Sequence, residues 1–388
     1  MAQVFFWLFL GMIVYAYLGY PLVLLLLSRI FEKPVRKKRA DRFVSVIISA
    51  FNEGAAIERK LRNLLELNYP PERLEILIGS DGASDRTDEI VSRFHSTQIR
   101  FFRFVENLGK PHVLSALVEE ARGEIIVFTD TRQELDREAI HALVENFEDP
   151  EVGCVSGELY FKREGNVDLA TDRGSVEGGM DVYWRYEKFL RKRESQMGSM
   201  LGATGAIYAI RKSLFPKLMP PYILVDDMYV PLQIIKRGYR AIFESEAKAY
   251  DRPSERGVQE FKRKVRTLAG NYQLFVFFPE LFLPWKSPIA WQLFSHKFLR
   301  LMVPFFLLGL FLTNLLILNH SAYQSFFLAQ CVFYGIAVIE VWQLRRRQGK
   351  KGIGYLPYTF CLLNYSAVVG LIRFVAGKQK SAWEKAYV

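Results

Sequence analysis

The sequence has few of the residues that build cysteine- or histidine-based centres. Its 388 residues include three cysteines, Cys154, Cys331 and Cys361, and five histidines. Three cysteines without a Cys-x-x-Cys pair exclude a disulfide framework and a cysteine-based zinc site. Five scattered histidines argue against a histidine-rich metal centre. The chain must therefore use other residue types for its stability and its chemistry.

Two common nucleotide-binding motifs are also missing. The pair Gly109-Lys110 lacks the upstream glycine and the following Ser or Thr of a P-loop. No Gly-x-Gly-x-x-Gly follows a predicted strand, which argues against a dinucleotide site. If this protein binds a nucleotide, it does so with a different set of loops.

Charge is abundant but unevenly distributed. Lys and Arg number 52 and Asp and Glu 41, for a net charge of +11, while 50% of the residues are hydrophobic and 24% charged. This composition is too apolar for a disordered chain and too charged for a pure membrane bundle. The length predicts two to three domains, and we expect water-soluble stretches beside segments with almost no charge.

Residues 4–30 are 27 in number and contain a single charge, Arg29. At 1.5 Å per residue they can cross a hydrocarbon core of about 30 Å. A retained span is favoured over a signal peptide, because no basic segment precedes the run and no small-residue cleavage site follows it. Six basic residues between 33 and 42 then predict contact with anionic lipid headgroups rather than nucleic acid. They also place the following chain in the cytoplasm and the N-terminus outside.

The C-terminal third repeats this pattern. Residues 298–318 and 322–342 are two further apolar runs, and the short connection between them predicts an antiparallel pair. Residues 353–376 form either a third span or a re-entrant or interfacial segment, because Arg373 and the lysines after it would otherwise lie outside. Residues 272–297 mix aromatic residues with prolines, which suits a segment along the headgroup layer.

The middle of the chain has the pattern of an α/β domain. Apolar runs at 43–50, 74–79, 99–104 and 124–129 predict buried strands. Helical spacing of apolar residues alternates with them, at 53–67, 85–94 and 111–121. This alternation predicts a parallel sheet with right-handed crossovers, whose ligands bind beyond the carboxyl ends of the strands.

Acidic loops follow three of these strands and contain Glu53, Asp81 and Asp130. One Asp-Gly after a strand is ordinary turn chemistry, but three acidic loops at one edge are not expected by chance. They suit ribose hydroxyls and a divalent cation that holds a diphosphate. Lys110 opens a helix, where a cation and the helix N-terminus together favour phosphate; a solvated surface lysine is the alternative.

Three segments resemble a known family. Residues 44–53 are similar to its opening strand and Asn-Glu loop, residues 80–85 to its Asp-Asp-Gly-Ser-x-Asp motif, and residues 107–110 to its Gly-Lys segment. Over about 43–271 and the flanking spans, the chain resembles the family 2 glycosyltransferases. This inverting GT-A group includes the membrane-embedded synthases of cellulose, hyaluronan and poly-N-acetylglucosamine. The resemblance implies a GT-A fold, with a Rossmann-like, mostly parallel sheet flanked by transmembrane helices.

The resemblance also implies a donor site. Glu53 and Asp81 would hold the base and ribose of a nucleotide-sugar, expected to be a UDP-sugar, and Lys110 would approach its diphosphate. Asp130 matches the first Asp of the metal-binding Asp-x-Asp and would bind Mg²⁺ or Mn²⁺. Arg132 replaces the second Asp, which weakens a site for a hard cation. We expect Arg132 to add positive charge near the diphosphate.

The acceptor side follows from the same resemblance. Val225-Asp226-Asp227 is similar to the Thr-Glu-Asp motif, which makes Asp227 the general base and places Asp226 beside the acceptor. Two carboxylates that favour a helix N-terminus are the alternative. Thr204 belongs to a small-residue turn that resembles the one closing over the acceptor. Trp184 on a predicted helix would stack on a sugar, or else pack on lipid or in the core.

Residues 263–267 depart from the Gln-x-x-Arg-Trp motif of the processive synthases. Arg266 fits the Arg of the motif, but Arg263 replaces the Gln and Thr267 the Trp. Both arginines are assigned to acceptor binding, although a helix facing headgroups explains this basic stretch as well. Without the Trp, an enzyme that adds one or a few sugars to a lipid-linked or growing glycan is favoured over a processive synthase.

The expected organisation is a span at 1–32, a cytoplasmic GT-A domain at 33–271, an interfacial segment at 272–297 and a membrane region of two to three spans at 298–388. The expected location is a bacterial plasma membrane. Two rivals stay open: a processive polysaccharide synthase and a catalytically inactive membrane subunit that binds a glycan or a partner. The enzymatic hypothesis requires Asp81, Asp130 and Asp227 to meet at one site facing the inner leaflet.

Overall fold

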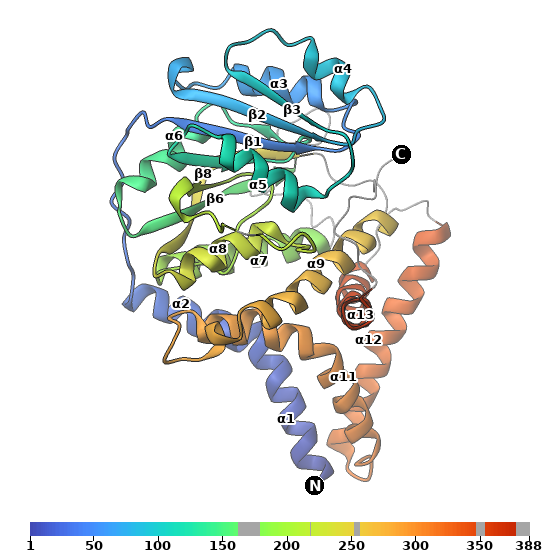
Figure 1. Cartoon of the computed structure of the whole chain (residues 1–388). Coiled ribbons are helices and arrows are strands. Elements are labelled where there is room, and N and C mark those ends of the chain that lie inside the picture. The colour runs from blue at the N-terminus through green and yellow to red at the C-terminus, as the bar shows by residue number, and fades with distance from the viewer. Residues whose placement is uncertain (162–178, 218, 252–256, 347–353, 378–388) are drawn as a thin grey trace. The chain divides into compact units, whose positions relative to one another are not determined.

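The computed structural model describes residues 1–161, 179–217, 219–251, 257–346 and 354–377. Within these ranges the chain forms two compact units. One contains the long apolar helices, the first part of α7 and most of α9 (Figure 1). The other contains a β-sheet with its covering helices.

The sheet has eight strands in the order β3-β2-β1-β4-β7-β6-β8-β5 among the residues described. Strands β1 to β4 pair in parallel, whereas β7 is antiparallel to both β4 and β6. β6 and β8 are parallel, and β5 is antiparallel to β8. The strands are β1 (Val44–Ala50), β2 (Leu74–Asp81), β3 (Ile99–Phe104), β4 (Ile125–Phe128), β5 (Glu134–Leu135), β6 (Val152–Phe161), β7 (Tyr208–Arg211) and β8 (Arg240–Asp251).

Helices cover both faces of the parallel half. Ile57 and Leu61 of α3 join the buried cluster that contains Ile78 of β2. The next residue of that strand, Gly79, faces the other way, and a Cβ there would lie 2.3 Å from a methyl carbon of Val113 in α5. The helices and 3₁₀ turns of this unit are α3 (Ile57–Leu65), η2 (Pro71–Arg73), α4 (Thr87–Ser92), α5 (Lys110–Glu120), α6 (Ala139–Val144), η3 (Glu145–Glu148), η4 (Lys212–Leu214) and α8 (Asp226–Lys236).

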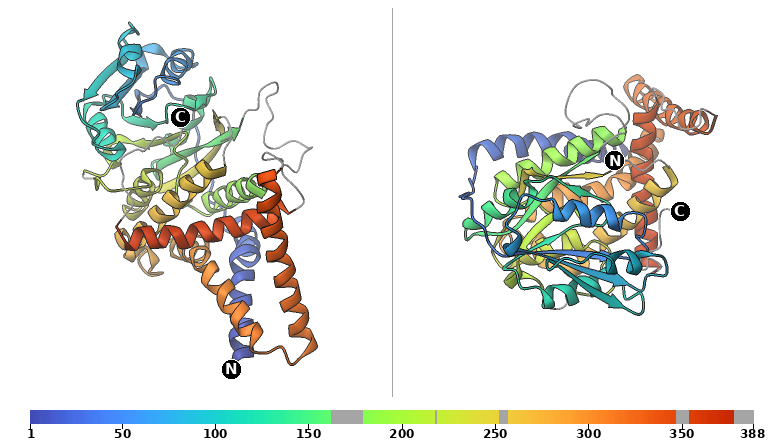
Figure 2. Two further views of the ribbon diagram at one scale, coloured as in Figure 1. Left: turned by 90° about the vertical axis from the view of Figure 1, so that its right-hand side faces the viewer. Right: turned by 90° about the horizontal axis from the view of Figure 1, so that it is seen from above.

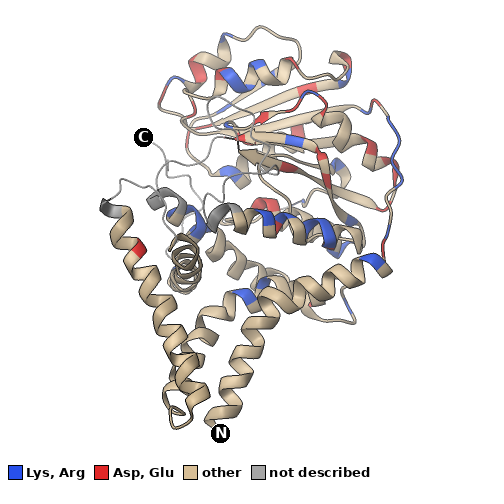
Figure 3. Ribbon diagram, turned by 180° about the vertical axis from the view of Figure 1, so that it is seen from behind, with Lys and Arg blue, Asp and Glu red and all other residues tan. Residues whose placement is uncertain are grey.

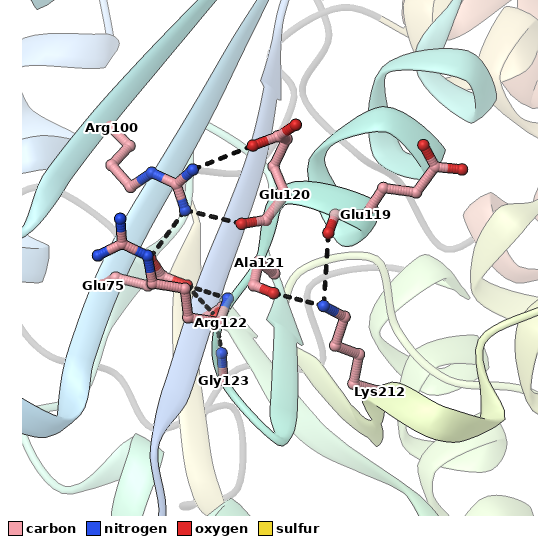
Figure 4. A network of polar contacts seen from close by, with 9 residues as sticks. Glu75, Arg100, Glu119, Glu120, Ala121, Arg122, Gly123 and Lys212 are labelled. Atoms are coloured by element: carbon pink, nitrogen blue, oxygen red, sulfur yellow. Dashed lines mark hydrogen bonds and ion pairs between the residues drawn. The ribbon is translucent and has the colours of Figure 1, made fainter.

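A polar network closes the amino ends of the parallel strands (Figure 4). Glu75 accepts hydrogen bonds from Ser45 Oγ (2.6 Å) and from the backbone amide of Arg122 (2.5 Å), and Arg100 Nη1 lies 3.1 Å from its carboxylate. Burial opposes ionisation of Glu75, but these donors hold its pKa below the ordinary value. Lys212 donates to the carbonyl oxygen of Ala121 at the same edge. The acidic loops that contain Glu53, Asp81 and Asp130 lie at the opposite edge, at the carboxyl ends of these strands.

The predicted strands and helices of the parallel half are confirmed, with α3 and α4 shorter than expected. The predicted fold class is confirmed, although the sheet is mixed beyond β4. Sequence reasoning did not identify β6 and β8, because both carry polar or charged residues among the apolar ones, such as Glu158 and Glu244, which are buried in the structure.

The second unit contains four helical stretches long and apolar enough to cross a membrane: Ala2–Ile30, Ala290–Leu315, Ser321–Leu344 and Tyr355–Val375. The last of these is the segment that the sequence left open between span and re-entrant loop. Figure 2 shows α11 and α12 as an antiparallel pair, and Figure 3 shows how few charges these ribbons carry. The elements are α1 (Ala2–Val14), η1 (Tyr15–Gly19), α2 (Tyr20–Ile30), α7 (Gly179–Gln196), α9 (Gly257–Phe277), η5 (Pro279–Phe282), α10 (Ala290–Gln292), η6 (Leu293–Phe298), α11 (Leu299–Leu315), α12 (Ser321–Arg346) and α13 (Tyr355–Val375).

One buried charge cluster ties α7 to the apolar helices. The two carboxylate oxygens of Glu187 contact Arg300 Nη1 and, at 3.2 Å, His296 Nε2. Burial opposes ionisation, but the charge of Arg300 and the hydrogen bond with His296 hold the pKa of Glu187 well below its usual range. A buried carboxylate is tolerated only when it is paired in this way. The predicted helix around Trp184 is therefore present and anchored.

Candidate active site

The site is built at the carboxyl edge of the parallel strands, where three loops are joined. The side-chain oxygen of Asn52 accepts the amide of Ser84 (2.7 Å), and the amide of Glu53 donates to Thr87 Oγ1 (2.8 Å). Asn52 has φ 54°, a left-handed conformation that asparagine tolerates better than most residues. The loop after β1 is thereby fixed against the loop after β2. Glu53, in the first of these loops, is half-buried.

Asp81 fixes the start of α5. Its side chain has no exposed surface, and its two carboxylate oxygens accept the amides of Leu108 (2.7 Å) and Gly109 (3.0 Å). Burial raises the pKa of Asp81 despite these hydrogen bonds. Gly109 has φ 86°, which favours glycine. By accepting these two amides, Asp81 fixes the backbone directly before Lys110, the first residue of α5.

Lys110 links two carboxylates that are far apart in sequence. Its ammonium lies 2.9 Å from Asp130 Oδ1, after β4, and 3.3 Å from Asp226 Oδ2, at the start of α8. The side chain is only 13% exposed. Burial alone would lower the pKa of Lys110, but Asp130 and Asp226 hold it above the ordinary value, with a smaller effect from Asp227. The cluster therefore contains three carboxylates and one ammonium.

Asp227 faces a different group from its neighbour Asp226. Its Oδ2 accepts the amide of Gly205 (3.1 Å), and its backbone carbonyl accepts the amide of Ala203 (2.8 Å). The turn that contains Thr204 is thus held on Asp227, and Thr204 itself is buried. Both carboxylates also lie in the first turn of α8, where the helix dipole favours negative charge. The position thus fits the alternative interpretation, and the role of Asp227 as general base stays a prediction.

Gly205 borders the space between two of the carboxylates. A Cβ built on it would lie 3.5 Å from Asp130 Oδ2 and 3.5 Å from Asp227 Oδ2, with no other atom closer. The missing side chain therefore leaves room between an oxygen of the loop after β4 and an oxygen of α8.

A buried lysine supports the loop after β4, and the sequence argument did not single it out. Lys60 of α3 is 1% exposed and donates to Thr129 Oγ1 (2.8 Å) and to the carbonyl oxygen of Gln133 (2.7 Å). Its position, three residues after Ile57, places it on the apolar face of α3, and this spacing was the available signal. Arg132 of the same loop lies 3.9 Å from Asp251 at the end of β8.

The other predicted acceptor residues belong to the unit of apolar helices. Trp184 is half-buried on α7, and the ammonium of Lys264 on α9 lies 4.8 Å from its ring centroid. Arg263 and Arg266 are on the same helix as Lys264. A cation over an aromatic face is stabilising. Lys264 was not singled out from the sequence, since only the three-dimensional fold brings α9 against α7.

The carboxylate oxygens of Asp130, Asp226 and Asp227 meet only some of the requirements of a site for a hard divalent cation. Carboxylate oxygens are the ligands that Mg²⁺ and related ions prefer. Among the residues described, however, no group of three or more His, Cys, Asp or Glu side chains is arranged to hold a metal. Protein sites for Mg²⁺ often supply one or two carboxylates and leave the remaining positions to water and substrate phosphates, and Asp130 fits that kind of site.

Comparison with known proteins gives one consistent result. Residues 45–219 match the family described as glycosyl transferase family 2. The chain is 25% identical over 316 residues to the probable glycosyltransferase YdaM of Bacillus subtilis, covering 76% of this chain and 71% of that protein. It is 24% identical over 237 residues to a poly-β-1,6-N-acetyl-D-glucosamine synthase of Staphylococcus aureus, covering 60% of this chain and 55% of that protein.

A solved structure is similar over nearly the whole chain. The mannosyltransferase PcManGT from Pyrobaculum calidifontis, in complex with GDP-Man and Mn²⁺, aligns with a TM-score of 0.71 at 20% identity and covers 98% of this chain and 100% of that one. The similarity establishes that the two chains share a fold, which agrees with the expected GT-A architecture.

Proposed function

We propose that this chain is a family 2 glycosyltransferase that moves a sugar, with inversion, from a nucleotide-sugar to a lipid-linked or growing glycan acceptor; the match of residues 45–219 to that family supports the proposal. One observation carries the proposal above all: the cluster in which Lys110 contacts Asp130 and Asp226, with Asp227 adjoining. It combines a cation for a diphosphate with a carboxylate able to take a proton.

The donor would bind over the loops at the carboxyl edge. Glu53 would contact the nucleoside, and Asp81 would act through the amides of Leu108 and Gly109 that it holds. Lys110 and Arg132 would supply positive charge for the diphosphate. Mg²⁺ or Mn²⁺ held by Asp130 would stabilise the negative charge of the leaving group. The Mn²⁺ and GDP-Man bound to the Pyrobaculum enzyme support this arrangement; a UDP-sugar is the proposed donor here.

Asp227 would act as general base. It would accept the proton of the acceptor hydroxyl as that oxygen bonds to the anomeric carbon and the bond from this carbon to the diphosphate oxygen breaks. Attack opposite to the leaving group inverts the configuration. A base must lie within hydrogen-bond reach of the proton it takes, and an acceptor oxygen beside Gly205 would lie close to Asp227 Oδ2.

Within the sheet unit, Thr204 and Asp226 would contact the acceptor. Trp184, Arg263 and Arg266 belong to the other unit, and their assignment to acceptor binding stays a prediction from the sequence. Four candidate spans and the basic residues between 33 and 42 support a multi-pass protein of the plasma membrane, bound to anionic lipids, with its catalytic domain in the cytoplasm. A lipid-linked acceptor would then reach the site from the inner leaflet.

The decisive experiment is a panel of nucleotide-sugars added to the detergent-purified full chain, with and without Mn²⁺. A ligand that binds only the folded protein raises its apparent melting temperature. We expect one UDP-sugar to raise it more with Mn²⁺ than with EDTA, and radiolabel from that donor to enter a lipid or glycan fraction. If no nucleotide-sugar shifts the transition, the proposed function is wrong; binding without transfer or hydrolysis would instead favour an inactive membrane subunit.

A processive polysaccharide synthase is the second candidate. The similarity to the staphylococcal poly-N-acetylglucosamine synthase favours it, although this chain spans 55% of that protein's length. Thr267, at the position of the motif's Trp, argues the other way. Sizing the product made with a large excess of acceptor separates the two: one or a few added sugars support the first candidate, and long chains on a small fraction of acceptors support the second.

A further inference from the structure

The backbone at Lys110 is fixed, and a long side chain carries its ammonium to the carboxylates. The amides of the two preceding residues are fixed by Asp81, and Lys110 is the first residue of α5. Its side chain, in contrast, has four flexible carbons and ends at the ion pairs with Asp130 and Asp226. A rotation about side-chain bonds can move the ammonium without any change in the fold.

The ammonium of Lys110 forms ion pairs with two of the three carboxylates. Asp226 is 8% exposed, and its Oδ2 has no hydrogen-bond donor in the part of the chain described, so the ion pair with Lys110 stabilises it. Asp130 Oδ1 accepts a hydrogen bond from the same nitrogen. An unpaired buried carboxylate is costly, so the ammonium of Lys110 stabilises the charge of Asp226.

A divalent cation would compete for the oxygens that Lys110 contacts. Hard cations prefer carboxylate oxygens, and Asp130 is the residue to which the metal is assigned. Two neighbouring cations form their contacts with other groups. Lys60 donates to Thr129 and to the Gln133 carbonyl, and Arg132 lies near Asp251.

We propose that Lys110 is a displaceable counter-ion, which pairs with Asp130 and Asp226 when no donor is bound and moves onto the donor's diphosphate when a divalent cation takes its place at Asp130. This inference rests on the proposed function. Its consequence is that the cation binds weakly alone and tightly together with a nucleoside diphosphate, because only the diphosphate gives the displaced ammonium a new partner. By linkage, each ligand then raises the affinity for the other by the same factor.

The test measures Mn²⁺ binding to the full chain in detergent, by the electron paramagnetic resonance signal of free Mn²⁺. Lys110→Met removes the competing charge, and we expect it to bind Mn²⁺ alone about tenfold or more tightly than wild type, equivalent to about 1.4 kcal/mol. Lys110→Arg keeps the charge and stays near wild type. Lys212→Met is the matched control, since Lys212 binds backbone carbonyls at the opposite edge of the sheet.

The second arm adds UDP to wild type and to Lys110→Met and measures Mn²⁺ binding again. UDP should tighten Mn²⁺ binding to wild type several-fold and should do so much less in Lys110→Met. The inference fails if Lys110→Met binds Mn²⁺ no better than wild type, or if UDP leaves Mn²⁺ affinity of the wild type unchanged. The wild-type arm remains decisive should Lys110→Met not fold. A protein that responds to nucleotide-sugars but shows neither effect retains the proposed function and loses this inference.

Discussion

At the scale of single residues, two adjacent carboxylates have different surroundings. Asp226 faces the ammonium of Lys110, whereas Asp227 accepts an amide hydrogen bond from Gly205. The role of general base is proposed for Asp227 because its Oδ2 borders the space beside Gly205, whereas Asp226 Oδ2 is the oxygen that Lys110 contacts.

Asp227→Asn tests this assignment. An amide cannot take the acceptor's proton, so kcat should fall by about 10²–10⁴, the usual contribution of a general base. The melting-temperature shift with the nucleotide-sugar should persist, because the donor is assigned to other residues. Glu120→Gln, in the network at the opposite edge, is the matched control. Near-normal turnover in Asp227→Asn would refute the assignment.

Gly205→Ala tests the space between the carboxylates. The new methyl group would be 3.5 Å from Asp130 Oδ2 and Asp227 Oδ2, an ordinary contact, so the free energy of unfolding should change by less than about 1 kcal/mol. Transfer should nevertheless fall by about 10²-fold, because misplacing the acceptor by about 1 Å has an effect of that size. Gly335→Ala, with open space around it, should leave kcat/KM unchanged. Full activity in Gly205→Ala would show that no reactant uses this space.

At the scale of elements, α3 does more than cover the sheet. Lys60 on its apolar face reaches the loop between β4 and β5 and binds both ends of it, at Thr129 and Gln133. Gln133 in turn donates to Asp251 at the end of β8 (2.7 Å). The loop that carries Asp130 and Arg132 is therefore fixed from two sides of the domain.

Lys60 should make stability depend on pH. Burial lowers its pKa from 10.5 to about 7, although Asp130, Glu134 and Asp251 oppose the shift. Between these pH values the unfolded chain binds more protons at this group than the folded chain. The free energy of unfolding should thus rise with pH from about 7 to 10, by at most about 1.4 kcal/mol per pH unit, and show no such slope from this group below pH 7.

Lys60→Met provides the comparison, because it keeps the apolar stem and removes the titrating group. Denaturant unfolding of the full chain in detergent, followed from pH 6.5 to 9.5, should show a steeper rise for wild type than for Lys60→Met. Parallel pH curves would mean that Lys60 is charged throughout this range in the folded protein.

At the scale of the whole molecule, the two units differ in the polarity of the side chains that they expose. Candidate spans carry many exposed apolar side chains, including Leu22, Leu308, Leu328 and Val338, which a lipid phase would accommodate. The sheet unit instead buries its apolar residues and exposes charge. This contrast supports the proposal of a membrane-bound enzyme with a water-soluble domain.

The proposed topology can be tested with single cysteines. With Cys331 and Cys361 changed to serine, Ser321→Cys lies at the start of α12, next to its connection with α11, and Ser96→Cys lies in a loop of the sheet unit. In intact cells an impermeant maleimide should label the first and reach the second only after lysis. The reverse pattern would mean that the catalytic domain faces outward.

The sequence alone determined the elements that repeat at regular spacing and the residues attached to their ends. Strands β1 to β4 follow from short apolar runs, helices α3 to α5 from the helical spacing of apolar residues, and the first three apolar helices from long stretches almost without charge. The sequence left the segment 353–376 open. Glu53, Asp81 and Asp130 could be singled out because they lie at or after the ends of strands, where function is concentrated in this class of fold. Asp227 was singled out by its resemblance to a family motif.

Only the tertiary structure decided what those residues contact. The pairing of Lys110 with Asp130 and Asp226, the support of Asp130's loop by Lys60, and the contact of Asp227 with Gly205 join segments between 20 and 116 positions apart. The placement of β6 and β8 beside β7 is of the same kind. Such contacts depend on how crossovers bring distant loops to one edge, and the free energy that selects them comes from packing of the whole domain, which no local pattern contains.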